Sequence, residues 1–74
     1  MNMRYLVVIE QGPTSCGAFV PDLPGCIAAG ETEAETLGLI QEAIRFQMKE
    51  LRRSGKPIPE PVSKSIIVEI GLIA

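Results

Sequence analysis

The stretch Val20-Pro21-Asp22-Leu23-Pro24-Gly25-Cys26 decides how this chain of 74 residues folds. Proline fixes φ and glycine tolerates positive φ, so two prolines followed by a glycine predict a rigid corner. Apolar, strand-like sequence lies on both sides of this corner. Asp22 has no obvious acidic companion, which favours a hydrogen bond that stabilises the turn over a catalytic role. We therefore interpret the stretch as a structural corner rather than a catalytic site.

Three segments around the corner read as strands. Residues 3–10 form a nearly continuous apolar run rich in β-branched residues, typical of a strand that is covered on both faces or central in its sheet. Residues 15–21 follow a turn cluster and are expected to pair with that run in antiparallel fashion. Residues 26–30 form a short third strand, and the prolines lie at strand ends, where they are tolerated.

A long helix is predicted for residues 33–54. Thr32 and Glu35 form a capping box, in which the hydroxyl and the carboxylate each accept from a backbone amide at the helix start. Gly55 is expected to end the helix, because glycine is favoured just after the last helical turn. Apolar residues recur at spacings of three and four and predict one stripe that lies on the sheet: Leu37, Ile40, Ile44, Met48 and Leu51.

A fourth strand is expected at residues 65–70, after a proline-rich connection. The element order is then β-β-β-α-β, and a helical crossover makes the third and fourth strands parallel if they share a sheet. We therefore expect a small α+β fold with a single domain over residues 1–74. Its three- to four-stranded mixed sheet carries the one long helix on one face and leaves the other face available for a partner.

Composition narrows the classes of function. Nine acidic and seven basic side chains give a net charge of −2, which lacks the electrostatic footprint of an autonomous nucleic-acid binder. The helix begins in an acidic cluster and ends in a basic one, which suits its macrodipole or a charged docking surface. No secretory leader or membrane span is evident, so a cytoplasmic location without a membrane partner is expected.

The sequence offers no catalytic, cofactor-binding or metal-binding set. The absence of histidine excludes Ser-His-Asp and Cys-His pairs and the commonest metal ligand. Pairing Pro21 with Cys26 across the corner would place Cys16 opposite Glu31 and keep the two sulfurs apart, so small buried strand residues are favoured over a disulfide or a metal site. We predict that the chain is not an enzyme and uses no cofactor.

Two pairs of residues are candidate partner or oligomer contacts. Leu39 and Phe46 are seven residues apart, so they share one line of the helix, roughly opposite the core stripe and among charged residues. Ile67 and Glu69 lie on the expected fourth strand.

The corner, the capped helix with Glu42-Ala43-Ile44 and the exit Gly55-Lys56-Pro57-Ile58-Pro59-Glu60-Pro61 together resemble the HicB-like antitoxin family, over about residues 4–70. The resemblance implies a partial RNase H-like fold in which the first strand lies between the second and the fourth. The fourth strand, with Ile67 and Glu69, would then be an open edge able to pair with another chain. It also implies a function: binding and neutralising HicA, a small toxin that cleaves mRNA.

This chain resembles a short form of the family, without the C-terminal DNA-binding segment of many members, so direct DNA binding by this chain alone is not expected. Self-association into a homodimer or higher oligomer is expected, because a domain this small is marginally stable alone. The alternative is a solitary, oligomeric HicB-like adaptor without a toxin.

Overall fold

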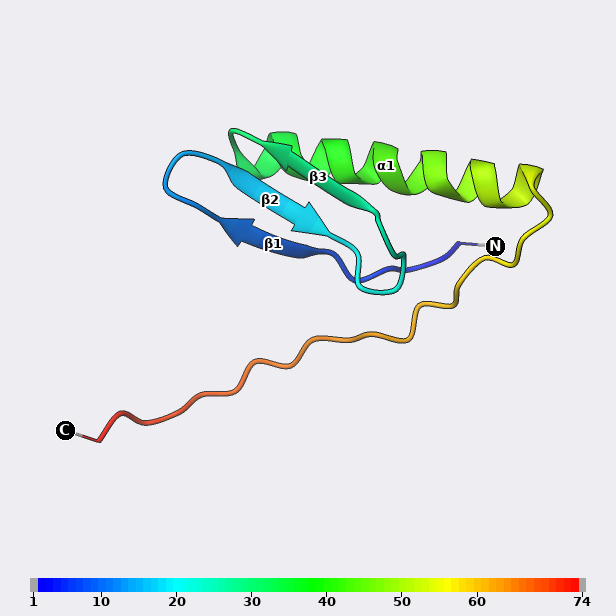
Figure 1. Ribbon diagram of the computed structural model, residues 1–74. Helices are drawn as coiled ribbons and strands as arrows, with labels where there is room; N and C mark the ends of the chain where they lie inside the picture. The colour runs from blue at the N-terminus through cyan, green and yellow to red at the C-terminus, as the bar shows by residue number, and fades with distance from the viewer. Residues whose placement is uncertain (1, 74) are drawn as a thin grey trace.

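Three strands and one long helix make up the regular structure of this computed structural model, which describes residues 2–73 (Figure 1). The strands are β1 (Val8–Gln11), β2 (Cys16–Phe19) and β3 (Ile27–Gly30), and the helix is α1 (Glu33–Arg53). The sheet is antiparallel with the order β1-β2-β3, and α1 packs along β3 and β2 on one face of it. The expected α+β class, with a long helix on one face of the sheet, is confirmed.

The register of the sheet follows from the corner. Phe19 pairs with Ile27, and Cys16 pairs with Gly30 rather than with Glu31, so the expected pairing is wrong by one residue. The hairpin loop is one residue longer than expected, because Val20 rather than Pro21 pairs with Cys26 and donates its backbone N–H to the Cys26 carbonyl at 3.2 Å.

The corner closes over the core that lies between sheet and helix. Leu23 is completely buried, and its carbonyl accepts from the backbone N–H of Cys26 at 3.1 Å. Gly25 has a φ of 81°, a value that an L side chain rarely adopts. The corner thus turns the chain and inserts one leucine into the core, whose buried members are Ala18, Val20, Leu23, Cys26 and Ile40.

Helix α1 begins as its sequence predicts. The Thr32 hydroxyl accepts from the backbone N–H of Glu35 at 3.1 Å, and the Glu35 carboxylate accepts from the N–H of Glu31 at 2.9 Å. The next residue, Thr36, is fully buried, and its hydroxyl lies 2.7 Å from the carbonyl oxygen of Thr32 and 3.3 Å from that of Cys16. The start of the helix is therefore attached to β2.

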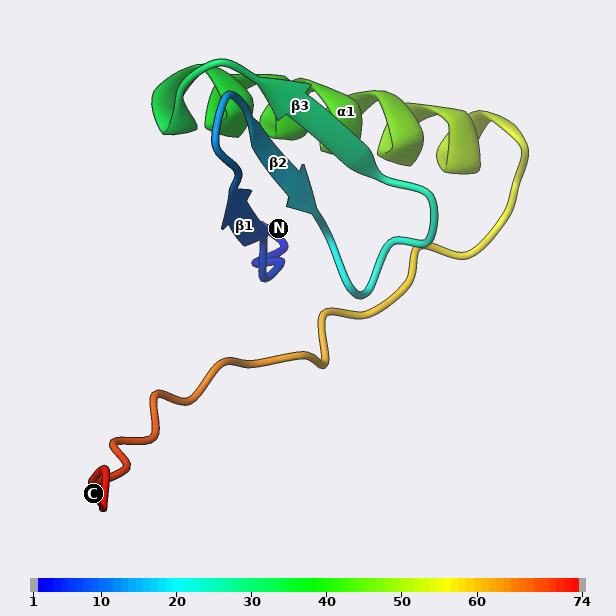
Figure 2. The ribbon, with the colours of Figure 1, turned by 60° about the vertical axis from the view of Figure 1, so that its left-hand side comes forward.

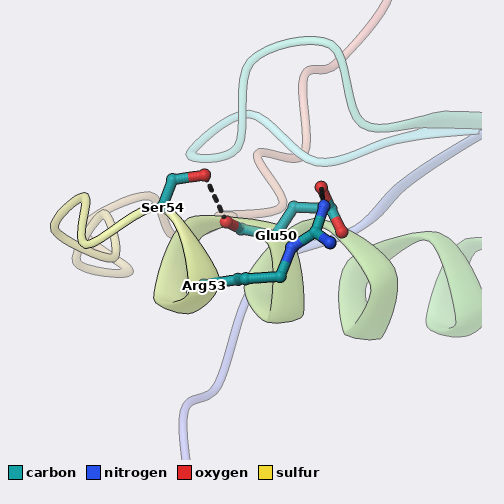
Figure 3. Close-up of polar contacts among 3 residues, drawn as sticks. All are labelled: Glu50, Arg53 and Ser54. Atoms are coloured by element: carbon teal, nitrogen blue, oxygen red, sulfur yellow. Dashed lines mark hydrogen bonds and ion pairs between the residues drawn. The ribbon is translucent and has the colours of Figure 1, made fainter.

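The helix ends at Arg53, and Gly55, two residues later, has a φ of 70° and donates its N–H to the carbonyl of Arg52 at 3.1 Å. Figure 3 shows the last turn, where the Ser54 hydroxyl donates to the Glu50 carbonyl at 2.8 Å and Arg53 forms an ion pair with the Glu50 carboxylate at 2.7 Å. The Arg53 side chain is 76% exposed and the Glu50 side chain 40% exposed, so solvent screens this ion pair and it adds little to stability.

Residues 65–70, expected as a fourth strand, do not form one. From Lys56 to Ile73 the chain has no regular structure and runs away from the sheet (Figures 1 and 2). A strand requires a neighbour that pairs with its backbone, and an apolar pattern alone does not supply one. The sheet is consequently three-stranded and purely antiparallel, and β1 is an edge strand rather than a central one.

Candidate partner-binding surfaces

The corner connects the helix and the C-terminal segment to the sheet. One carboxylate oxygen of Asp22 accepts from the backbone N–H groups of Val62, at 3.0 Å, and Ser63, at 2.9 Å. The other accepts from the Ser63 hydroxyl at 2.8 Å. The amide of Gln47 on α1 donates to the carbonyl of Pro24 at 3.2 Å. The polar groups of the corner are therefore engaged in holding the fold together.

These contacts change the chemistry of Asp22. Hydrogen bonds hold the pKa of the Asp22 carboxyl below its usual value. The largest effect comes from the Ser63 backbone N–H, the next from the Ser63 hydroxyl, and the Val62 N–H adds to them. The expected turn-stabilising hydrogen bond is replaced by contacts with residues forty positions further along the chain. Sequence spacing carries no signal for such a long-range contact.

A second contact holds the same segment. The hydroxyl of Tyr5 donates to the carbonyl of Pro59. Burial, together with the charge of Asp22, raises the pKa of the Tyr5 phenol, so the group remains a donor at neutral pH. Residues 59–63 are thus fixed beside the chain that leads into β1.

The two cysteines lie inside the molecule. Both are free thiols, Cys16 1% exposed and Cys26 3% exposed. Burial raises the pKa of the Cys26 thiol, which keeps it protonated and unreactive at neutral pH. Within residues 2–73, no group of three or more histidine, cysteine or acidic side chains is placed to hold a metal ion.

Leu39 and Phe46 lie on one flank of α1, and Phe46 on this flank borders Ile27 of β3. The buried face of the helix is formed by Thr36 and Ile40, so the expected position roughly opposite the core is wrong by about a quarter turn. Leu39 is 39% exposed and Phe46 67% exposed. Phe46 borders a shallow groove of about 280 Å³ between helix and sheet, lined by Gly25, Cys26, Ile27, Ala43, Phe46, Gln47 and Glu50.

Ile27 belongs to this surface, although it was not among the predicted contacts. It is 71% exposed, pairs with Phe19 and lines the sheet side of the groove beside Phe46. Side chains alternate between the two faces of a strand, so the burial of Cys26 places its neighbour Ile27 outward. That alternation is the signal that could have identified Ile27.

Ile67 and Glu69 are placed elsewhere. Both lie on the exposed C-terminal segment, and Ile67 is 97% exposed. Figure 1 shows this segment running away from α1, so the structure does not bring the two predicted pairs together. Their roles as contacts stay predictions.

The fold and these surfaces define a small α+β protein with an exposed apolar flank. The model of the HicB-like antitoxin of bacterial toxin–antitoxin systems matches residues 5–69. The chain therefore belongs to the HicB-like antitoxin family. The match includes every strand, the helix and most of the C-terminal segment.

Three relatives extend this comparison. UPF0150 protein Ta0767 of Thermoplasma acidophilum is 36% identical over 67 residues, which cover 89% of this chain and 97% of that protein. Antitoxin HicB 2 of Photorhabdus laumondii is 32% identical over 85% of this chain and 45% of its own length. An uncharacterized 14.9 kDa protein from the rep-hol intergenic region of Haemophilus phage HP1 is 33% identical over 78% of this chain and 44% of its own length.

This chain thus spans less than half of the length of the two latter relatives. No solved structure shows significant similarity to it. None of the helices among the described residues has the length and apolar character required to cross a membrane.

Proposed function

We propose that this protein is an antitoxin that binds a HicA-type, mRNA-cleaving toxin and inhibits it by covering its active surface. The carrying observation is the family match over residues 5–69, which includes the whole sheet and helix. The similarity to Antitoxin HicB 2 over most of this chain supports the same assignment. In this proposal the protein acts in the cytoplasm, by binding rather than catalysis, and does not bind DNA by itself.

The groove beside Phe46 is the proposed contact surface. It joins an exposed aromatic ring to Ile27 on the sheet, and aromatic residues beside a shallow groove are frequent anchors of protein interfaces. Glu50 lines the same groove, and the chain carries a net charge of −2. A toxin that binds RNA requires a basic surface, so the charges of the two proteins are complementary and favour rapid association.

The test is an RNA-cleavage assay with the toxin encoded beside the gene for this chain. Wild-type protein is expected to abolish cleavage at a stoichiometric ratio. Phe46→Glu and Leu39→Glu each place a charge on the same flank of α1 and are expected to weaken inhibition by about tenfold or more.

Leu37→Glu provides a matched control, since Leu37 is 40% exposed and Leu39 is 39% exposed. Positions two residues apart in a helix point to different sides, so Leu37→Glu should inhibit as well as wild type. Unchanged RNA cleavage in the presence of wild-type protein contradicts the proposal and favours the adaptor without a toxin. Equal loss in Leu37→Glu and Leu39→Glu argues against this flank as the contact.

A further inference from the structure

The C-terminal arm, defined here as residues 64–73, presents an apolar surface that its own chain does not cover. Its large apolar side chains are between 70% and 99% exposed: Ile66, Ile67, Val68, Ile70, Leu72 and Ile73. Monomeric proteins rarely leave so many neighbouring apolar side chains in water. The arm is therefore a segment that lacks its partner.

The sequence of the arm is that of a strand. Ile66, Val68 and Ile70 share one side of an extended chain, while Ile67 and Glu69 share the other. A side that is wholly apolar and a side that is mixed suit a strand at the margin of a sheet, with the apolar side toward the core. The missing partner is thus a sheet edge.

The sheet has such an edge along β1. One side of β1 pairs with β2, and the other side pairs with no strand in residues 2–73. The start of the arm lies on this side of the molecule. Residues 63–65 border the same groove as Arg4 and Leu6, which lead into β1. An open edge of this kind readily accepts another strand.

The contacts of residues 59–63, which immediately precede the arm, direct the arm away from its own sheet. Asp22 holds Val62 and Ser63, Tyr5 holds Pro59, and beyond these contacts the arm diverges from β1 in both ribbon views (Figures 1 and 2). The radius of gyration, 15.0 Å, exceeds the value of about 11 Å for a compact chain of this length.

We propose that two copies of this chain exchange arms, each arm pairing with the β1 edge of the other copy as an added strand. Every copy has one arm to donate and one edge to accept it, so the exchange closes with two-fold symmetry at two copies. Both exposed features of the monomer are covered by the same contact. This inference does not depend on the toxin, because it concerns the protein alone.

Light scattering during size-exclusion chromatography tests the assembly. Wild-type protein is expected to have twice the chain mass of 8.0 kDa. Val68→Pro removes a backbone donor from the arm and should raise the dimer dissociation constant by about a hundredfold or more. Its circular dichroism should show α1 intact, since Val68 is 70% exposed and lies outside the sheet and helix.

Two further variants serve as controls. Val68→Thr keeps the backbone donor and the β-branched shape and should remain dimeric. Phe46→Glu alters an apolar residue that is 67% exposed outside the arm and should also remain dimeric. A monomer in the Phe46→Glu sample and a dimer in the Val68→Pro sample would assign the assembly to α1 and overturn the proposal.

Cross-linking distinguishes exchange from an arm that folds onto its own sheet. A benzophenone maleimide can be attached to Ile67→Cys, because the natural cysteines are at most 3% exposed and resist labelling in the folded protein. In a co-refolded mixture of ¹⁴N and ¹⁵N chains, links from the arm to β1 should join the two isotopes. Links within one isotope alone, or a wild-type monomer at every concentration, overturn arm exchange.

Discussion

Asp22 shows how one carboxylate can serve both a turn and a distant segment. It occupies a corner that needs two prolines and a glycine for its shape, yet within residues 2–73 its oxygens accept from Val62 and Ser63, about forty positions further along the chain. A corner residue that holds the residues immediately before the arm controls the direction in which the arm leaves the molecule. In the proposed arm exchange, the corner therefore contributes to assembly as well as to folding.

The depressed pKa of Asp22 predicts how acid affects this contact. A carboxyl whose pKa is lower in the folded state contributes stability above its unfolded pKa and loses that contribution as the pH falls through the folded value. We expect the amides of Val62 and Ser63 to be protected from hydrogen exchange at neutral pH and to lose protection below the usual range of an aspartate.

Hydrogen exchange by NMR across an acid titration measures this effect. Asp22→Ala should remove the protection of both amides at every pH. Glu60→Gln changes an exposed carboxyl nearby and should leave the protection unchanged. Protection that persists in Asp22→Ala would show that the aspartate does not hold the arm.

Gly30 allows the first turn of α1 to approach β3 closely. A Cβ at this position would lie 2.8 Å from the Thr36 hydroxyl and 2.7 Å from a carboxylate oxygen of Glu35. The Thr36 side chain is buried and cannot move away freely. We expect Gly30→Ala to lower the free energy of unfolding by about 1–3 kcal/mol.

Urea denaturation at one chain concentration measures this change. Gly38→Ala is the matched control, because a Cβ there meets no atom within 4 Å. That substitution should raise the free energy of unfolding by about 0.5–1 kcal/mol, as alanine is the better helix former. A neutral result for Gly30→Ala would mean that the helix start shifts without cost.

At the scale of the elements, the two ends of α1 depend on local chemistry. The Thr32 side chain satisfies one of the amides that a helix leaves without an internal partner. Gly55 ends the helix in the left-handed conformation, and Lys56 donates its N–H to the Leu51 carbonyl at 2.9 Å, so the last carbonyls are also satisfied.

Removing the N-cap should therefore weaken the fold. Thr32→Ala is expected to lower the free energy of unfolding by about 1 kcal/mol, whereas Thr32→Ser keeps the hydroxyl and should change it by a few tenths of a kcal/mol at most. Thermal denaturation followed by circular dichroism separates the two. Equal losses in both variants would show that the methyl group of Thr32 matters more than its hydroxyl.

Features of α1 that depend only on residues close in the sequence could be predicted, and those that depend on packing against the sheet could not. The boundaries of α1 follow from residues within one turn of each end, such as Thr32 and Gly55. Its buried face depends on packing against the sheet, so Thr36 is fully buried while Leu37, expected on the core stripe, is 40% exposed. Phe46 was correctly expected at the surface, but its position beside Ile27 required the hairpin and helix together.

The C-terminal segment is the clearest case of a pattern that local sequence cannot resolve. Alternating apolar residues at 65–70 indicate a strand but do not identify the strand with which it pairs. In the isolated chain that neighbour is missing, and the segment is extended and exposed instead. The pattern is consistent with the proposed arm exchange, in which the neighbouring strand belongs to another copy.

At the scale of the whole molecule, the amount of buried surface limits stability. A domain of this size buries a modest share of its surface, and the buried apolar core consists of few side chains. Each fully buried Ile, Leu or Val side chain contributes about 1.5–3 kcal/mol. Covering two or three residues of the arm would therefore add stability comparable to that of a marginal small domain.

Arm exchange predicts that stability depends on the concentration of the chain. Folding that is coupled to dimer formation gains about 1.4 kcal/mol per mole of dimer for each tenfold rise in concentration, so the melting temperature of the wild type should increase across a dilution series. Val68→Pro should melt at a lower temperature that does not change with concentration. Differential scanning calorimetry measures both melting temperatures. Mass action requires the melting temperature to shift with concentration whenever dimer and unfolded chain interconvert. A wild-type melting temperature that is constant over a hundredfold range of concentration would therefore contradict assembly through the arm.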